Sequence, residues 1–184
     1  EYYTQGLSYL GNNMLDEAIE ELKKSIEIDP KFSDAHKNLG IAYFRQSNFN
    51  ESLLSFNQAV VLNSYDFESL TYMGIIYRRK DMAAKSIIML EKAIDINPYD
   101  ERAYYHLGNT YFRKGDLDKA TEIYNKIIEI NTDYARVYYK LAQVYRIKKQ
   151  YNIAWENIYK AQELGFKVPD SFIEKLKSSQ KEPE

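Results

Sequence analysis

The sequence predicts an all-α fold, in which antiparallel helix pairs are stacked and one C-terminal helix caps the stack. Small residues recur every 34 residues, at Gly6, Gly40, Gly74, Gly108 and Ala142. A tyrosine follows each of them at the third residue, beginning with Tyr9. Within one step, apolar residues are spaced three and four apart, as in an amphipathic helix. A constant step of this length is typical of a solenoid of small units, not of one globular core.

The composition suits a folded, helix-rich protein and narrows the classes of function. Of the 184 residues, 45% are hydrophobic and 28% are charged, with only 7 Gly and 4 Pro. The net charge of −2 gives no general attraction to nucleic acid or membrane. The lack of cysteine excludes disulfides, thiolate nucleophiles and cysteine-bound metals. No apolar run approaches the roughly 18 residues that a membrane span needs.

The sequence leaves the compartment and the oligomeric state open. We expect a soluble protein, with a cytoplasmic location slightly favoured, and we expect no cofactor. The chain begins at Glu1, inside a repeat, so we expect a mature protein or a piece of a longer one.

Five consecutive units carry the pattern without an insertion or a deletion. We number each unit so that the recurring small residue is position 8, which makes Glu1 position 3 of the first unit. The units span residues 1–32, 33–66, 67–100, 101–134 and 135–168. The linkers are only a few residues long, so neighbouring helices are expected to be antiparallel.

Each unit is expected to hold two helices, as the fourth unit illustrates. Its first apolar stripe consists of Tyr104, Leu107, Gly108 and Tyr111. In the turn that follows, Gly115 supplies a positive φ and Asp116 can cap the next helix. The second stripe consists of Leu117, Ala120, Ile123, Tyr124, Ile127 and Ile128. The unit ends near residues 131–133, and the Asp29-Pro30 and Asn97-Pro98 pairs end the second helix of the first and third units.

This pattern resembles the tetratricopeptide repeat, which has an aromatic or apolar residue at position 4, Gly at 8, Tyr at 11, small residues at 20 and 27, and Pro at 32. The third unit supplies Leu70, Met73, Gly74, Tyr77, Ser86, Leu90, Ala93 and Pro98. The fourth departs from the pattern at Ile127 and Thr132, and the fifth has Phe166 at position 32. The resemblance covers residues 1–168. It implies a right-handed superhelical solenoid that presents a groove to an extended or helical segment of another protein.

The repeated glycine predicts a close contact between the two helices of a unit. A glycine inside a helix costs about 0.5–1 kcal/mol relative to alanine, so its recurrence implies a compensating approach. The small residues at position 20 are expected on the facing side of the second helix. A bulky residue at Gly74 should therefore overpack the contact.

After residue 168 the repeat signature stops, and residues 169–178 are expected to form a capping helix. Phe172, Ile173 and Leu176 give this segment a short apolar face, and Lys175 and Lys177 a polar one. A terminal cap with a polar outer face is what a stack of repeats requires. A partner-binding peptide is the alternative. Residues 179–184 are expected to be a frayed tail.

No catalytic or metal site is expected. The only two histidines, His36 and His106, occupy different repeat positions, and no cysteine accompanies them. The sequence contains no HExxH, P-loop, GxGxxG or GxSxG motif. The acidic residues lie mainly on the second helices, where a solvated outer face explains them.

The resemblance implies that positions 2, 5, 6, 9, 12 and 13 line the inner groove, and all seven arginines of the chain fall on these positions. Arginine pairs with carboxylates or phosphates through two parallel hydrogen bonds, which lysine cannot do. The candidate peptide-binding residues are Lys37, Asn38, Arg45, Tyr72, Arg79, Arg102, Tyr105, His106, Asn109, Arg113, Arg136, Tyr139, Lys140 and Arg146.

The helix dipole offers a simpler explanation for five of these arginines. Positive charge is favourable at the C-terminal end of a helix. This accounts for Arg45, Arg78, Arg79, Arg113 and Arg146. Arg102 and Arg136 lie near expected helix N-termini, where the dipole disfavours them, so they are the residues most expected to bind a ligand.

These residues favour a non-catalytic scaffold that binds an acidic protein or peptide segment. Some members of the family hold acidic C-terminal tails in a carboxylate clamp, but only Asn38, Arg136 and Lys140 fit that pattern here. Single-stranded RNA binding is the second hypothesis, because arginines and aromatic rings also form a stacking platform. We do not expect nucleic acid as the partner, since the chain is net acidic. A regulatory or assembly segment of a larger protein is the third hypothesis.

Overall fold

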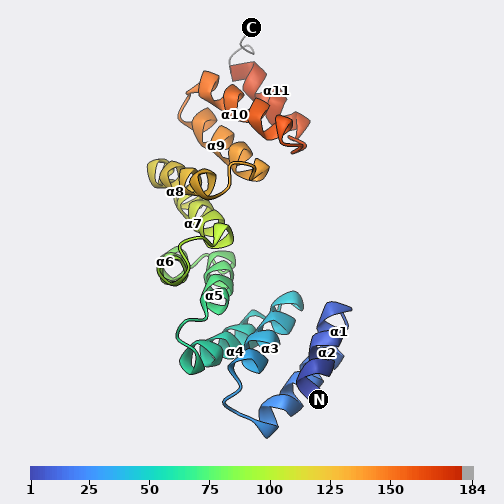
Figure 1. Ribbon diagram of the computed structural model, residues 1–184. Coiled ribbons are helices and arrows are strands. Elements are labelled where there is room, and N and C mark those ends of the chain that lie inside the picture. Colours follow the sequence, from blue (N-terminus) through green and yellow to red (C-terminus); the bar gives the residue numbers. More distant parts are fainter. Residues whose placement is uncertain (180–184) are drawn as a thin grey trace. The chain divides into compact units, whose positions relative to one another are not determined.

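The computed structural model describes residues 1–179, so the expected tail at 179–184 lies outside the described residues except for Ser179. The described part contains eleven α-helices and no strand, which confirms the all-α fold (Figure 1). The chain divides into two compact units, the first spanning Glu1–Pro98 and the second beginning at Tyr99.

The first compact unit contains three helix pairs. Their bounds are α1 Tyr2–Gly11, α2 Leu15–Ile28, α3 Ser33–Arg45, α4 Phe49–Leu62, α5 Phe67–Arg79 and α6 Ala83–Ile96. The partners in each pair pack along their length, and α2 and α4 also pack on the first helix of the next pair. The core runs between the pairs, around Leu22 and Leu39 and then around Phe56, Met73 and Ile76.

The second compact unit contains two helix pairs and the capping helix. Their bounds are α7 Glu101–Lys114, α8 Leu117–Ile130, α9 Ala135–Ile147, α10 Tyr151–Glu163 and α11 Asp170–Ser179. Phe172 and Leu176 of α11 are buried in one cluster with Trp155 and Ile158 of α10. They lie 34 residues after Tyr138 and Ala142, so α11 keeps the step of the repeat although the sequence signature stops at residue 168.

The predicted close approach at the repeated glycine is confirmed. A Cβ added to Gly74 would lie 2.5 Å from Cγ of Leu90, and one added to Gly108 would lie 2.5 Å from Cε1 of Tyr124. The facing side chain is therefore at position 24, while the small position-20 residues are buried beside it. In the second unit of the sequence, Ser52 Oγ donates a hydrogen bond of 2.8 Å to the carbonyl oxygen of Gly40.

An Asx turn ends most of the second helices, because position 31 is Asp or Asn in four units. Asp29 Oδ1 accepts from Lys31 N at 3.0 Å, and Asn131 Oδ1 accepts from Asp133 N at 2.9 Å. At the other end, Asp116 Oδ1 accepts from the backbone N of Lys119 at 3.2 Å, which confirms the expected cap of α8.

The turn between the two helices has one backbone conformation in all five repeats. Its residue at position 15 has a positive φ in each case: 60° at Asn13, 64° at Ser47, 59° at Asp81, 81° at Gly115 and 60° at Lys149. Only one of these residues is glycine, the residue that adopts this region without a steric cost. Asn13 and Asp81 tolerate this region through their short polar side chains, whereas Ser47 and Lys149 lack that advantage.

Replacing Lys149 with glycine is expected to stabilise the protein by about 0.5–1 kcal/mol. Relief of the left-handed conformation is worth about 1–2 kcal/mol, and the added flexibility of the unfolded chain subtracts about 0.5–1 kcal/mol. Urea unfolding followed by circular dichroism measures the change. The matched control is Gly115→Ala, which should destabilise the protein. A loss of stability in Lys149→Gly would contradict the claim that the left-handed conformation of Lys149 is strained.

A second contact recurs between the turn of one repeat and the second helix of the preceding repeat. Gln46 Nε2 donates to Asp16 Oδ1 at 2.6 Å, and Lys80 Nζ donates to Asn50 Oδ1 at 2.9 Å. Lys148 forms the equivalent ion pair with Asp118. We call these three pairs the connector bonds; in each, the two residues are 30 apart in sequence.

Candidate functional site

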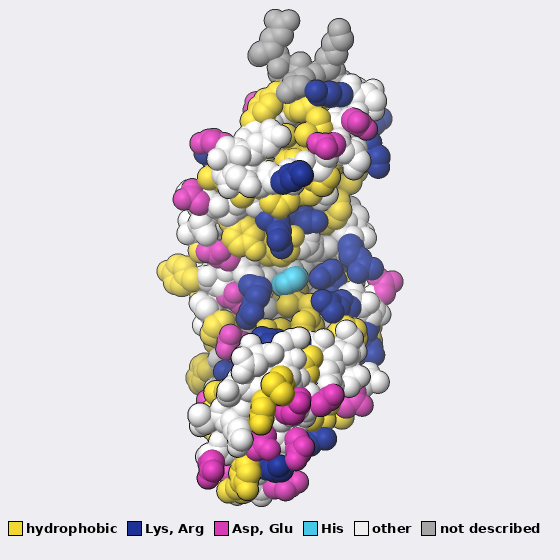
Figure 2. All heavy atoms as spheres, turned by 90° about the vertical axis from the view of Figure 1, so that its right-hand side faces the viewer, with side chains coloured by type: hydrophobic (Ala, Val, Ile, Leu, Met, Phe, Trp, Pro, Cys, Tyr) yellow, Lys and Arg dark blue, Asp and Glu magenta, His cyan; other side chains and the backbone are white. Residues whose placement is uncertain are grey.

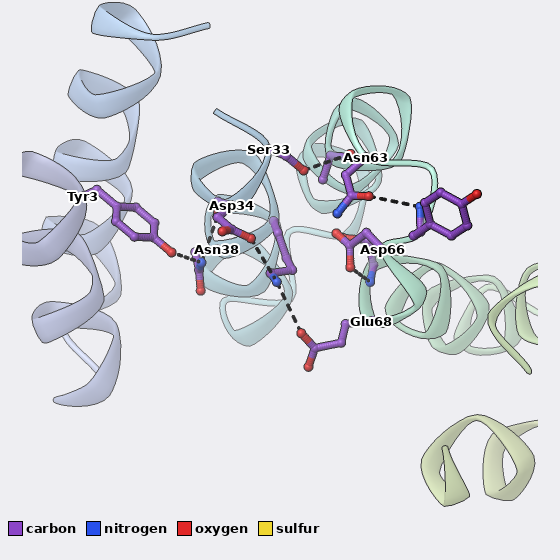
Figure 3. Close-up of polar contacts among 11 residues, drawn as sticks. Tyr3, Ser33, Asp34, Asn38, Asn63, Asp66 and Glu68 are labelled. Carbon is purple, nitrogen blue, oxygen red and sulfur yellow. Dashed lines mark hydrogen bonds and ion pairs between the residues drawn. The ribbon is translucent and has the colours of Figure 1, made fainter. Parts of the chain in front are cut away.

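The first-helix residues of the first compact unit mostly bond to one another. Lys37 Nζ lies 3.2 Å from Asp34 Oδ1 and 3.3 Å from Glu68 Oε2, so its charge is balanced within the chain (Figure 3). Burial lowers the pKa of Lys37, but the hydrogen bond with Asp34 and the nearby acidic charges outweigh burial and raise the pKa above its ordinary value. Lys37 therefore links α3 to α5 and is not a free cation.

Asn38 and Arg45 connect the second repeat to the first. Asn38 Nδ2 donates to the hydroxyl of Tyr3 at 3.2 Å and to the carbonyl oxygen of Asp34 at 2.8 Å (Figure 3). Arg45 Nη1 donates to the carbonyl oxygen of Leu10 at 2.7 Å. Leu10 is in the last turn of α1, and its carbonyl oxygen also accepts from the backbone N of Asn13 at 3.3 Å, so Arg45 adds a second hydrogen bond at the helix end of the preceding repeat.

Tyr72 and Arg79 are engaged with aromatic rings of the same compact unit. The Arg79 guanidinium lies 4.8 Å from the ring centre of Phe44 and 5.4 Å from that of Phe49. Tyr72 stacks on Phe56 at 5.1 Å between ring centres and meets Phe44 edge-on at the same distance. These contacts stabilise the packing of successive repeats, and each is worth about 0.5–1.5 kcal/mol.

Arg136 is different, because it is an exposed cation beside a hollow. No hydrogen bond or ion pair to another residue of the range 1–179 holds its guanidinium. It lines a hollow of about 460 Å³, which we call the Arg136 hollow. The remaining walls come from the start of α9 and the linker before α11: Tyr134, Ala135, Leu164, Gly165 and Phe166.

Tyr134, which lines this hollow, carries a hydroxyl that can donate a hydrogen bond. Burial raises the pKa of Tyr134, the neighbouring Tyr105 adds to the rise, and Arg136 opposes it. The phenol therefore stays neutral near pH 7 and keeps its proton. The Tyr105 ring lies 5.9 Å from the Tyr134 ring and 5.5 Å, edge-on, from the His106 ring.

The other candidates on α7 lie in mixed surroundings. Arg102 is half-buried in the first turn, where its backbone N donates to Asp100 Oδ1 at 3.1 Å. Asn109 Oδ1 accepts a hydrogen bond of 3.0 Å from the buried Tyr124 hydroxyl. Arg113 is exposed at the C-terminal end of the helix. Lysine and arginine side chains gather near a histidine on the face shown in Figure 2.

Tyr139 and Arg146, on α9, are covered by the C-terminal segment. The Tyr139 ring stacks on Phe166 and meets Phe172 edge-on, each at 5.2 Å between centres. The Arg146 guanidinium lies 5.5 Å from the centre of the Phe172 ring. Tyr139 therefore anchors α11, while Lys140 Nζ, one residue on, donates to Gln143 Oε1 at 3.3 Å.

Sequence reasoning did not select Tyr134 or Phe166, although both line the Arg136 hollow. Tyr134 is at position 34, outside the groove positions. Phe166 replaces the proline expected at position 32, and that departure was the available signal. Within residues 1–179, no group of three acidic or histidine side chains could hold a metal, and no helix is long and apolar enough to cross a membrane.

The antiparallel pairs, the 34-residue step and the paired glycine contacts define a helical-repeat protein. Sequence profiles identify the class further: the profile described as TPR repeat matches residues 6–47 and 108–146, and the one described as tetratricopeptide repeat matches residues 89–122. The chain belongs to the tetratricopeptide repeat family. No curated protein sequence matches it.

Solved structures share the fold. A crystal structure of MamA is 28% identical, with a TM-score of 0.81, and the match covers 92% of this chain and 96% of that one. PilF of Pseudomonas aeruginosa is 20% identical, with a TM-score of 0.85 and coverage of 96% and 82%. YrrB, described as a TPR protein with an unusual peptide-binding site, is 20% identical, with a TM-score of 0.74 and coverage of 89% and 84%.

Proposed function

We propose that this protein is a non-catalytic scaffold that binds an acidic, extended or helical segment of another protein. The family supports the general role, since its repeats bind proteins and peptides. The preference for an acidic ligand rests on one observation: the guanidinium of Arg136 is exposed and has no acidic partner among the described residues. It borders a hollow whose other walls are largely apolar or aromatic.

The chemistry of this hollow suits a carboxylate next to an apolar side chain. The guanidinium of Arg136 offers two parallel N–H donors to a carboxylate, and the neutral Tyr134 hydroxyl offers another. Phe166 and Leu164 present apolar surface for a neighbouring side chain. Arg136 is the second residue of α9, where the helix dipole disfavours a cation, so helix stability does not explain its presence.

We place the acid-binding site on the second compact unit. In the first unit, Lys37 is balanced by two carboxylates, Arg45 is bonded to a helix end, and Arg79 lies against two rings. In the second, Arg136 has no acidic partner among the described residues, and its hollow is lined by Tyr134 and Phe166. Tyr139 takes no direct part, because its ring is engaged by Phe166 and Phe172.

Substituting Arg136 tests the proposal. The probe is a fluorescein-labelled peptide of alternating Glu and Leu, compared with its Gln counterpart by fluorescence anisotropy. We expect Arg136→Gln to weaken binding of the Glu peptide about tenfold, because a hydrogen bond to a charged group is worth about 1.5–3 kcal/mol. The Gln peptide should bind both proteins equally, and added salt should weaken the Glu peptide most.

Lys92→Gln is the matched control, since it removes one positive charge from an exposed position on α6. It should change binding of the Glu peptide by less than about twofold. Equal effects of Arg136→Gln and Lys92→Gln would reject the site. Tight, salt-sensitive binding of labelled oligouridine in place of the Glu peptide would support the RNA hypothesis instead.

A further inference from the structure

A second hollow lies where α11 crosses the C-terminal half of α9. Its volume is about 260 Å³, and residues of α7, α9 and α11 line it. The polar residues in its wall include Gln143 and Arg146 of α9 and Ser171 and Lys175 of α11. Phe112 and Ile147 supply part of the apolar wall. Binding sites for small organic molecules usually exceed about 300 Å³, so this hollow is sized for a single side chain.

The charge of this hollow is uncompensated. Its lining contains two cations, Arg146 and Lys175, and no aspartate or glutamate. Within the described range, neither the Arg146 guanidinium nor the Lys175 ammonium makes an ion pair. Arg146 lies against the Phe172 ring, and its Nε is buried without a hydrogen-bond acceptor. Two like charges that share one small hollow repel each other, and an anion between them removes that cost.

The geometry points to a carboxylate side chain of the bound peptide as the occupant of this hollow. The inference rests on the proposed function and deepens it, because it makes α11 a part of the binding site as well as a cap. The carboxylate would lie between Arg146 and Lys175, with the Gln143 amide and the Ser171 hydroxyl as further donors. Phe112 and Ile147 would contact the methylene groups that carry the acid.

The apolar wall favours a peptide over a free anion. A small anion needs donors on all sides, whereas Phe112 and Ile147 provide contact only to carbon. The same face of α9 begins at Arg136, whose hollow takes the acid of the proposed function. A segment with two acidic residues could therefore occupy both sites of the second compact unit.

The charge of Lys175 can be removed without disturbing the core, because its side chain is exposed while Phe172 and Leu176 hold the helix. With the labelled Glu peptide, we expect Lys175→Gln to weaken binding about five- to tenfold and Lys175→Arg to restore it. The Gln peptide should be unaffected. Lys167→Gln, which removes an exposed charge just before α11, should change binding by less than about twofold.

Equal weakening by Lys175→Gln and Lys167→Gln would overturn the inference, because only overall charge would then matter. If Arg136→Gln weakens the Glu peptide and Lys175→Gln does not, this hollow is not a carboxylate site, and the proposed function stands. If the Glu peptide does not bind the wild-type protein, both proposals fail. Glutarate that displaces the peptide at equal concentration would assign the hollow to a free anion and overturn the peptide as its occupant.

Discussion

Replacing Trp155 with alanine is expected to lower the free energy of unfolding by about 3–5 kcal/mol. The side chain is only 1% exposed and belongs to the cluster that joins α10 to Phe172 and Leu176 of α11. Truncation removes a large apolar contact and leaves a cavity that the helices cannot fill without shifting. Urea unfolding followed by far-ultraviolet circular dichroism measures the loss.

Trp155→Phe is the informative companion to this variant. The indole Nε1 is buried without a hydrogen-bond acceptor, so phenylalanine removes an unsatisfied donor while it keeps most of the ring volume. We expect less than about half the loss of the alanine variant. Tyr65→Ala, at a side chain that is 77% exposed, should be nearly neutral. A Trp155→Ala protein as stable as Tyr65→Ala would show that α11 does not depend on this cluster.

Replacing Gly74 with leucine is expected to destabilise the first compact unit by about 1–3 kcal/mol through overpacking. Its Cβ alone would lie 2.5 Å from Leu90 Cγ, far inside contact distance, so α5 and α6 must move apart. The better helix propensity of leucine recovers less than about 1 kcal/mol. A thermal melt followed by circular dichroism measures the balance.

Gly11→Ala is the matched control, since nothing lies within 4 Å of the Cβ that it adds. It should leave the melting temperature unchanged or raise it slightly. In a double variant, Leu90→Ala should make room for the new side chain, so the two losses should be less than additive. A Gly74→Leu protein with the same melting temperature as the wild type would contradict the close contact between α5 and α6.

The fold was predictable because one physical constraint repeats. Glycine lowers helix propensity at positions 40, 74 and 108, so another interaction must offset that cost. At each position the offsetting interaction is the same close contact between the two helices of a repeat. The capping helix was also predicted, but its continuation of the 34-residue step was not. With only Phe172 and Leu176 at matching positions, the signal is too short to distinguish from chance.

The candidate site was less predictable, because a sequence gives residue types at groove positions but not their partners. Lys37 and Arg136 occupy groove positions alike, yet Lys37 is balanced by Asp34 and Glu68 from two different helices. The left-handed residue at the turn was foreseen only at Gly115. Ser47 and Lys149 adopt the same conformation although neither is glycine, so residue type alone did not predict it.

The connector bonds have a consequence for how such an array changes in length. The donor is at position 14 of one repeat, and the acceptor is at position 18 of the preceding one. A second copy of residues 33–66, inserted after the first, would carry both a donor and an acceptor. Its Gln46 would face Asn50 of the first copy, and its Asn50 would face Lys80 of the repeat that follows. A copy of this repeat can therefore be gained or removed while each connector bond keeps a donor and an acceptor, so recombination in steps of residues 33–66 should yield folded chains.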